Sequence, residues 1–139
     1  MQIRECKSDD EIMTTYRVVE QLYEFTSEQF LSYIKEMTTT EYRLIGVYNE
    51  GDQCVAAVGF RVGRRLYCGR YLHIDNMIVD HKHRNQGLAS EMLGWLREEA
   101  MRLECDVLLA DTYVENTPAQ DFFYKEGFQK RGHHLKASV

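Results

Sequence analysis

The sequence is poor in the features that mark fibrous, membrane-spanning and disulfide-rich proteins. Its 139 residues include one proline, its four cysteines show no C-x-x-C spacing, and it has no apolar run near the roughly 18 residues of a membrane helix. Disordered, collagen-like and coiled-coil classes are also excluded, because 44% hydrophobic and 28% charged residues lie close to the globular average. We expect one domain with a core of its own.

Positive charge is also in short supply. The chain has 17 lysines and arginines against 22 aspartates and glutamates, a net charge of −5, which argues against a nucleic-acid scaffold. No apolar stretch follows the first basic residues, as it would in a signal peptide. We therefore expect a cytoplasmic protein with no membrane or nucleic-acid partner. The cysteines lie in apolar segments and are interpreted as buried reduced thiols: Cys6, Cys54, Cys68 and Cys105.

The first half of the chain predicts a strand, two helices and three strands. Ser8 with Glu11, and Thr26 with Gln29, have capping-box spacing, so each pair marks a helix start. From Tyr42 the apolar spacing changes to the period of strands. The expected elements are a strand over 3–6, helices from 9 to about 23 and from 27 to 37, and strands over 44–48, 54–62 and 66–79, with a turn at 63–65.

The second half predicts a helix, a strand, a helix and a strand. Thr117, Pro118 and Gln120 suit the N-cap, first and third positions of a helix that Gly127 would end. The short apolar run 107–110 is typical of a strand covered on both faces. The expected elements are a helix over 88–103, a strand over 107–110, a helix from 118 and a strand from 128 onward. The order predicts a mixed α/β domain over 1–139.

One segment suggests chemistry: a strand ending at Val79 runs through a basic loop into a helix with a small first turn. The first N–H groups of a helix have no partner within it and, with the positive end of the helix dipole, they form an anion site. Gly87 and Ala89 leave room for a pyrophosphate at the backbone, and Lys82 and Arg84 add positive charge. The alternative is a basic loop that caps an ordinary helix.

This segment resembles a known family. Residues 84–89, Arg-Asn-Gln-Gly-Leu-Ala, match the Arg/Gln-x-x-Gly-x-Gly/Ala signature of the GNAT superfamily of N-acetyltransferases, and Met77 and Val79 match the strand before it. The resemblance spans the chain and implies a GNAT-like α/β fold, a mixed sheet in the order β-α-α-β-β-β-α-β-α-β with helices on both faces. A second GNAT motif, Asn-x-x-Ala-x-x-Phe-Tyr-x-x-x-Gly-Phe, is matched at Asn116, Ala119, Phe122, Gly127 and Phe128.

The resemblance implies a site for acetyl-CoA as the acyl donor, and no metal. Backbone N–H groups of the loop would bind the pyrophosphate, and the preceding strand would pair with the pantetheine arm as with an added strand. Asn116 is expected at the cofactor arm, or as a residue just before the N-cap of the last helix. The expected cofactor-binding residues are Met77, Ile78, Val79, Arg84, Asn85, Gln86, Gly87, Leu88, Ala89, Asn116 and Phe123.

Acyl transfer to an amine requires that the amine lose a proton, and Asp75 is our candidate base. A lysine-like amine has a pKa of about 10.4, so its deprotonation at neutral pH costs on the order of 4–5 kcal/mol. Asp75 lies on the strand leading into the loop, where many GNAT relatives carry a carboxylate. His73, on the same strand face, is an alternative base. Asp75 is otherwise an exposed strand carboxylate or a contact for a substrate cation.

The sequence departs from the family at the acid that protonates the departing thiolate. GNAT relatives place a tyrosine four residues before the glycine of the second motif, where this chain has Phe123. Tyr124, rotated by about 100° on a helix, is our candidate acid, with packing as the alternative, and Tyr113 is another nearby hydroxyl. A thiol, with a pKa of about 8.5, leaves more readily than an amine. We therefore expect transfer to survive the change.

Two functions remain open. The first is an N-acetyltransferase that moves an acetyl group from acetyl-CoA to a primary amine of a small molecule or peptide. The second is an acyl-CoA-binding module with little or no transfer, suggested by the missing tyrosine.

Four arginines near the 63–65 turn are interpreted as solvated, or as meeting an acidic part of a substrate or a second subunit: Arg61, Arg64, Arg65 and Arg70.

The carboxyl end suggests a possible homodimer. Twelve residues follow Gly127, enough for one strand where many GNAT relatives have two. Either the second strand is absent or a partner chain completes the sheet edge, which would otherwise be bare.

Overall fold

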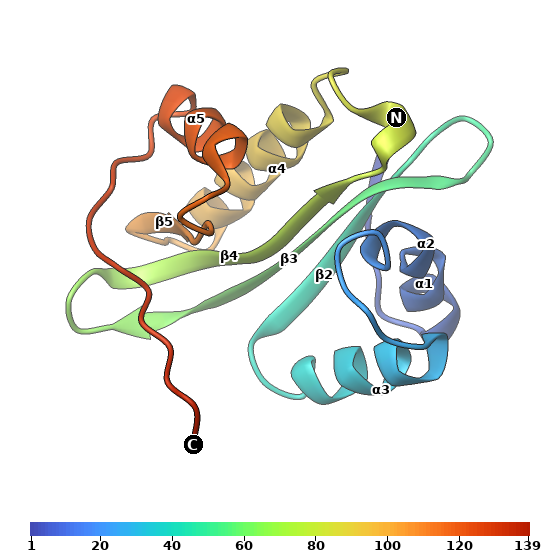
Figure 1. Ribbon diagram of the computed structural model, residues 1–139, viewed down its shortest axis with the longest axis horizontal. Coiled ribbons are helices and arrows are strands. Elements are labelled where there is room, and N and C mark those ends of the chain that lie inside the picture. The colour runs from blue at the N-terminus through green and yellow to red at the C-terminus, as the bar shows by residue number, and fades with distance from the viewer. The chain divides into compact units, whose positions relative to one another are not determined.

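The computed structural model describes residues 1–139, which form two compact units, 1–109 and 110–139. The chain contains a five-stranded sheet in the order β1-β2-β3-β4-β5 (Figure 1). The elements are β1 (Gln2–Glu5), α1 (Asp9–Thr14), α2 (Tyr16–Val19), α3 (Ser27–Met37), β2 (Tyr42–Tyr48), β3 (Cys54–Arg65), β4 (Gly69–Val79), the 3-10 turn η1 (His81–His83), α4 (Leu88–Arg102), β5 (Val107–Ala110) and α5 (Thr117–Lys125).

Helices cover both faces of the sheet in the first unit, as predicted. Ala57 of β3 and Ile78 of β4 belong to a buried cluster with residues of α1, α2 and α3. Phe60, an odd number of residues along β3 and so on the opposite face, packs against Trp95 of α4 with ring centroids 6.2 Å apart. Figure 1 shows the helices α1 to α3 on one side of the strands and α4 on the other. The predicted α/β fold class is confirmed.

Both predicted capping boxes are present, but the first helix is broken. The side chains of Ser8 and Thr26 each accept a backbone N–H, from Glu11 and Gln29. The helix expected to reach residue 23 is instead two short helices, α1 and α2, joined at Thr15. Thr15 is fully buried, and its hydroxyl donates to the carbonyl of Ile12 at 2.7 Å. Such a bond from threonine to the preceding turn is known to bend helices.

The β3–β4 hairpin is longer than predicted. The turn expected at 63–65 was wrong, because β3 continues through Arg65 and the turn follows at 66–68. Gly63 does not turn the chain. It pairs with Tyr71 across the hairpin, and a Cβ on Gly63 would lie 2.7 Å from the Tyr71 hydroxyl. The glycine therefore makes room for a tyrosine ring.

Three further predictions at the carboxyl end needed correction. Asn116, not Thr117, caps α5, because its Oδ1 accepts the N–H of Ala119 at 3.2 Å. The strand expected from Phe128 onward does not form: residues 128–139 have no regular structure. The N–H of Phe128 donates to the carbonyl of Phe123 at 2.9 Å, so it closes the end of the helix rather than opening a strand. The residues of β5 are half-buried, not covered on both faces.

No helix of the structure is both long enough and apolar enough to span a bilayer. The homodimer inferred from the short carboxyl end stays a prediction.

Candidate functional site

The amino end of α4 differs from those of three other helices. Side chains of Ser8, Thr26 and Asn116 cap α1, α3 and α5, whereas α4 begins after Gly87 with no side-chain cap. Gly87 has φ of +80°, a left-handed conformation that glycine adopts without steric cost, and no atom lies within 4 Å of where its Cβ would be. The first N–H groups of this 15-residue helix are therefore left to an anion.

The loop residues before α4 are exposed, while the helix behind them is anchored. Arg84, Asn85 and Gln86 are exposed, and Asn85 also takes a left-handed conformation with φ of +62°. Leu88 is 3% exposed, so its side chain belongs to the core and only its backbone is available to a ligand. The geometry suits a pyrophosphate bound by backbone N–H groups, with Arg84 adding charge.

The strand that leads into the loop extends past its neighbour. The N–H of Asp106 donates to the carbonyl of Arg70 at 2.7 Å, so β5 and β4 begin at the same end and run parallel. Since each residue of a strand advances about 3.3 Å, β5 ends at Ala110 opposite the middle of β4. Residues 77–79 pair with Val58, Ala57 and Ala56 of β3 on one side. In an antiparallel pair, alternate residues direct their backbone groups to the other side, where an extended ligand can add.

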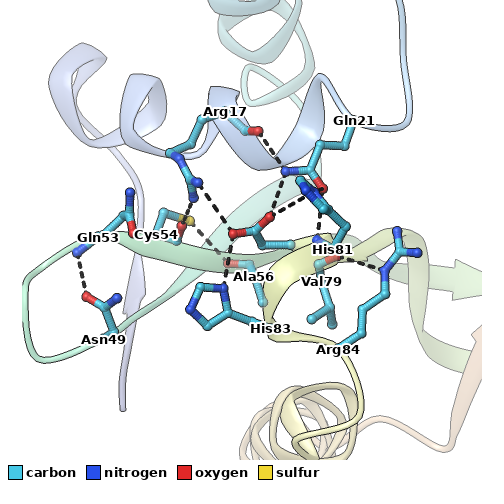
Figure 2. A network of polar contacts seen from close by, with 11 residues as sticks. Arg17, Gln21, Asn49, Gln53, Cys54, Ala56, Val79, His81, His83 and Arg84 are labelled. Carbon is cyan, nitrogen blue, oxygen red and sulfur yellow. Dashed lines mark hydrogen bonds and ion pairs between the residues drawn. The ribbon is translucent and has the colours of Figure 1, made fainter.

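A buried carboxylate, Asp80, holds the base of the loop. Its side chain is 0% exposed and accepts from Gln21 Nε2 at 2.9 Å and His83 Nδ1 at 3.0 Å, with Arg17 Nη2 at 3.4 Å. Gln21 also accepts the N–H of His81 at 3.1 Å. Figure 2 shows Gln21 reaching toward His81 and Arg17 toward Cys54. The network ties the loop to the chain at α2, whose residues Val18 and Val19 pack on β3 and β4.

The network keeps Asp80 charged. Burial alone would raise the pKa of this carboxyl, but hydrogen bonds from Gln21, His83 and the backbone of Lys82, with the charge of Arg17, lower the pKa well below its usual range. The folded-state pKa therefore lies below that of the unfolded chain. Asp80 stabilises the fold above the ordinary carboxyl pKa, and this contribution is lost as the pH falls below it.

We expect Asp80→Asn to destabilise the protein at pH 7 by about 1–3 kcal/mol, because the amide leaves Arg17 and His83 without a charged partner. The free energy of unfolding, measured by denaturant titration, should differ most from wild type at neutral pH. The difference should shrink below about pH 4, because the Asp80 carboxyl of the unfolded wild-type chain gains a proton there and the folded form does not. An equal difference at pH 7 and pH 3 would contradict the charged role.

Asp75 lies at an irregularity of β4. Gly59 pairs with Asn76 and the next residue, Phe60, pairs with Ile74, so Asp75 is the extra residue of a β-bulge. Asp75 shares the face of His73, which pairs with Arg61, and the bulge brings Asn76 onto that face as well. The Arg61 Nε donates to Asp75 Oδ2 at 2.8 Å. The two side chains are 28% and 29% exposed. The proposed base thus has an arginine as its partner, which the sequence analysis did not predict.

Tyr42 and Asn76 are hydrogen-bonded to each other next to the Arg61–Asp75 pair. The Tyr42 hydroxyl donates to Asn76 Oδ1 at 2.9 Å, and the Arg61 guanidinium lies 5.4 Å from the Tyr42 ring centroid. Burial raises the pKa of Tyr42, and the nearby charge of Asp75 raises it further, so the phenol stays protonated. A Cβ on Gly59 would collide with the Tyr42 hydroxyl, so this glycine allows the ring to cross β3.

His73 is the alternative candidate for the base. Its Nδ1 lies 3.1 Å from Arg65 Nη1. Because a guanidinium can only donate, this contact occupies the Nδ1 lone pair. The Arg65 guanidinium is itself placed over the ring of Tyr71, 4.1 Å from its centroid. Both candidate bases thus contact an arginine, and the role of base stays a prediction.

The second unit carries the remaining predicted residues. Phe123 packs against Phe122 and Phe128, with ring centroids 5.2 and 5.0 Å apart. Tyr124, one position along α5, is 46% exposed. The cap at Asn116 uses Oδ1 and leaves the amide N–H groups outside that bond. The roles expected for these residues stay predictions.

The roles of Asp80 and Tyr42, and the partner of Arg61, were not predicted from the sequence. Asp80 offered one signal, a carboxylate between Val79 and two closely spaced histidines. Arg61 was predicted as one of four arginines near a turn, either solvated or meeting an acidic part of a substrate or a second subunit, but its pairing with Asp75 was not predicted. Nothing local marked Tyr42, because its partners come from other strands.

Comparisons with known proteins agree with this geometry. A search of curated protein sequences gives no significant match. Solved structures match over the full length. An aminoglycoside 6'-N-acetyltransferase of Acinetobacter haemolyticus, AAC(6')-Ig, has a TM-score of 0.84 at 14% identity, covering 100% of this chain and 98% of that one. Glucosamine-6-phosphate N-acetyltransferase of Arabidopsis thaliana has a TM-score of 0.78 at 19% identity, covering 99% and 97%.

A third solved structure contains a coenzyme A derivative. AAC(6')-Iy in complex with the bisubstrate analogue CoA-S-monomethyl-acetylneamine has a TM-score of 0.85 at 14% identity, covering 99% of this chain and 97% of that one. At these identities the likeness shows the fold, not the substrate. The family model described as the acetyltransferase (GNAT) family matches residues 9–128. Because that model covers most of the chain, the chain belongs to the GNAT family of acetyltransferases.

Proposed function

We propose that the protein is an acetyl-CoA-dependent N-acetyltransferase that transfers the acetyl group directly to a primary amine of a small molecule or peptide. The observation that supports it best is the pairing of two features. The uncapped, glycine-initiated α4 follows directly on β4, and β4 continues past the end of β5. One feature suits a pyrophosphate and the other an extended pantetheine arm.

The donor site is proposed from backbone groups more than from side chains. The N–H groups of residues 84–89 bind the pyrophosphate, and the backbone of 77–79 pairs with the pantetheine arm. Asn116 and Phe123 are kept as proposed contacts of the cofactor, on the match of their segment to the second GNAT motif. The Asp80 network fixes the loop relative to β3, since the N–H of Asp80 also donates to the carbonyl of Val55 at 2.9 Å.

The chemistry follows from the residues at the bulge. The acceptor arrives as an ammonium ion, and the Asp75 carboxylate takes one proton from it, directly or through water. The amine nitrogen then bonds to the thioester carbonyl carbon, and the carbon–sulfur bond breaks. The nitrogen loses its second proton to water, and the thiolate gains a proton to leave as the coenzyme A thiol. We propose Tyr124 as the donor of that proton.

The direct test is thiol release from acetyl-CoA, screened against small amines, amino acids, amino sugars and peptides. Aminoglycosides and glucosamine 6-phosphate belong in the screen, because two of the similar solved structures are of N-acetyltransferases named for these compounds. We expect turnover with one amine class and none with the matching alcohols. Calorimetric binding of coenzyme A without turnover on any amine would support the binding-module alternative. The absence of both would contradict the proposed donor site.

A further inference from the structure

The Arg61–Asp75 ion pair lies beside the proposed reaction centre. Asp75 is two residues before Met77, where the pantetheine arm is expected to begin, and both side chains are partly open to solvent. The surrounding structure holds both side chains in place. Asp75 is the extra residue of a β-bulge, and the Arg61 guanidinium lies over the ring of Tyr42. A fully buried ion pair contacts only protein groups. In a partly exposed pair such as this one, each charged group can also bind a ligand of opposite charge.

Arg61 keeps donors for a ligand. Its guanidinium has five N–H groups. Nε donates to Asp75, and Nη1 reaches Thr40 Oγ1 only at 3.5 Å, the limit of a hydrogen bond. A planar guanidinium binds a carboxylate or phosphate through two parallel N–H bonds. Arg61 can therefore bind an acidic group while its Nε stays on Asp75.

The charges around the pair alternate in sign. On the same face of the hairpin, Arg65 lies over the ring of Tyr71, and the Tyr71 hydroxyl lies 3.4 Å from a Glu41 carboxylate oxygen. A polycation would place a second ammonium against Arg61 or Arg65, which costs energy because like charges repel. A molecule with one ammonium and one acidic group meets an opposite charge at each end.

We propose that the acceptor carries an acidic group within a few bonds of its amine, as amino acids do, and that Arg61 binds this group while Asp75 binds the ammonium. The spacing fits, because the two protein charges are 2.8 Å apart at their nearest atoms and the two charges of an α- or β-amino acid are separated by one or two carbons. This inference rests on the proposed transferase function. It narrows the acceptor to zwitterionic amines and disfavours polyamines.

The test compares amino acids with their carboxamides as acceptors, using thiol release from acetyl-CoA. The carboxamide keeps the amine and removes the acid, and its amine is the less basic of the two, so intrinsic reactivity favours the carboxamide. We expect the wild type to prefer the acid at least tenfold in kcat/KM. Arg61→Gln should bring this ratio close to one, while the Kd for coenzyme A stays unchanged.

Arg64→Gln is the matched control. Arg64 is an exposed arginine on the same strand, and its side chain points to the opposite face because faces alternate. The Arg64→Gln variant should have the same ratio of kcat/KM for the amino acid over the carboxamide as the wild type. Circular dichroism and thermal melting check that each variant is folded. An Arg61→Gln protein that fails to fold is replaced by Arg61→Lys, which keeps the charge but loses the two-bond geometry and should lose most of the preference.

The outcomes separate the two proposals. Wild-type turnover of carboxamides or polyamines equal to or faster than that of amino acids overturns the inference and leaves the transferase function standing. An acid preference that Arg61→Gln retains also overturns it. No thiol release with any amine contradicts the transferase function, and the acceptor inference with it.

Discussion

Replacing Ala89 with glutamate should weaken coenzyme A binding at least about a hundredfold and leave fold stability within about 1 kcal/mol of wild type. Ala89 is the second residue of α4, in the turn whose N–H groups have no side-chain cap. A carboxylate there favours the helix, because it interacts well with the positive end of the dipole. The same carboxylate repels a pyrophosphate and occupies its place. Binding and stability should therefore move independently.

Ala89→Gln is the control that separates bulk from charge. It has nearly the same shape as Ala89→Glu and no charge, so it should weaken binding by less. Kd is measured by calorimetry and stability by denaturant unfolding. Coenzyme A binding that is unchanged in the glutamate variant would show that the pyrophosphate does not lie at this helix end, and the reading of the loop would be wrong.

Asp75→Asn should lower kcat/KM for acetyl transfer by about 10²–10³-fold at pH 7, because an amide cannot take a proton from the ammonium. The deficit should shrink as the pH rises toward the pKa of the acceptor amine, about 10.4 for a lysine-like group, where free amine is already abundant. The asparagine can still accept from Arg61 through its amide oxygen. Coenzyme A binding should stay the same, since Asp75 is not part of the donor site.

A surface aspartate provides the comparison for Asp75. Asp52 also pairs with an arginine, Arg4, at 2.7 Å, and its side chain is 73% exposed. Asp52→Asn should leave the rate unchanged at every pH. If Asp75→Asn retains the wild-type rate at pH 7, Asp75 is not the base. A deficit that stays constant up to high pH would instead indicate a role in acceptor binding.

Features that depend on residues close together in the chain could be predicted from the sequence. The capping boxes at Ser8 and Thr26 were predicted because the paired residues are three apart in the chain. The donor loop was predictable for a similar reason: its chemistry lies in consecutive backbone N–H groups, and only small residues at fixed spacing permit it. The helix break at Thr15 was not predicted, because that hydroxyl bonds within its own turn without changing the apolar period.

The parts that failed depend on contacts between distant segments. Asp80 is 59 residues from Gln21 and 63 from Arg17, and no pattern in the chain links them. The Arg61–Asp75 pair requires the register between β3 and β4, which no local pattern gives. The bulge also places Asn76 on the face of Asp75, where strand alternation alone would put it on the opposite face. Gly63 was misread as a turn, because a glycine that makes room for a cross-strand ring has the same sequence signal as one that bends the chain.

The central claim is that coenzyme A binds to two backbone segments, residues 77–79 and 84–89. An NMR titration of the 15N-labelled protein with coenzyme A tests it most directly, because each backbone amide reports on its own surroundings. We predict that the largest shifts fall on the amides of these two segments, follow one binding curve, and disappear in Ala89→Glu. Shifts confined to other segments, such as the 63–69 hairpin, or no shifts at millimolar coenzyme A, would contradict the account.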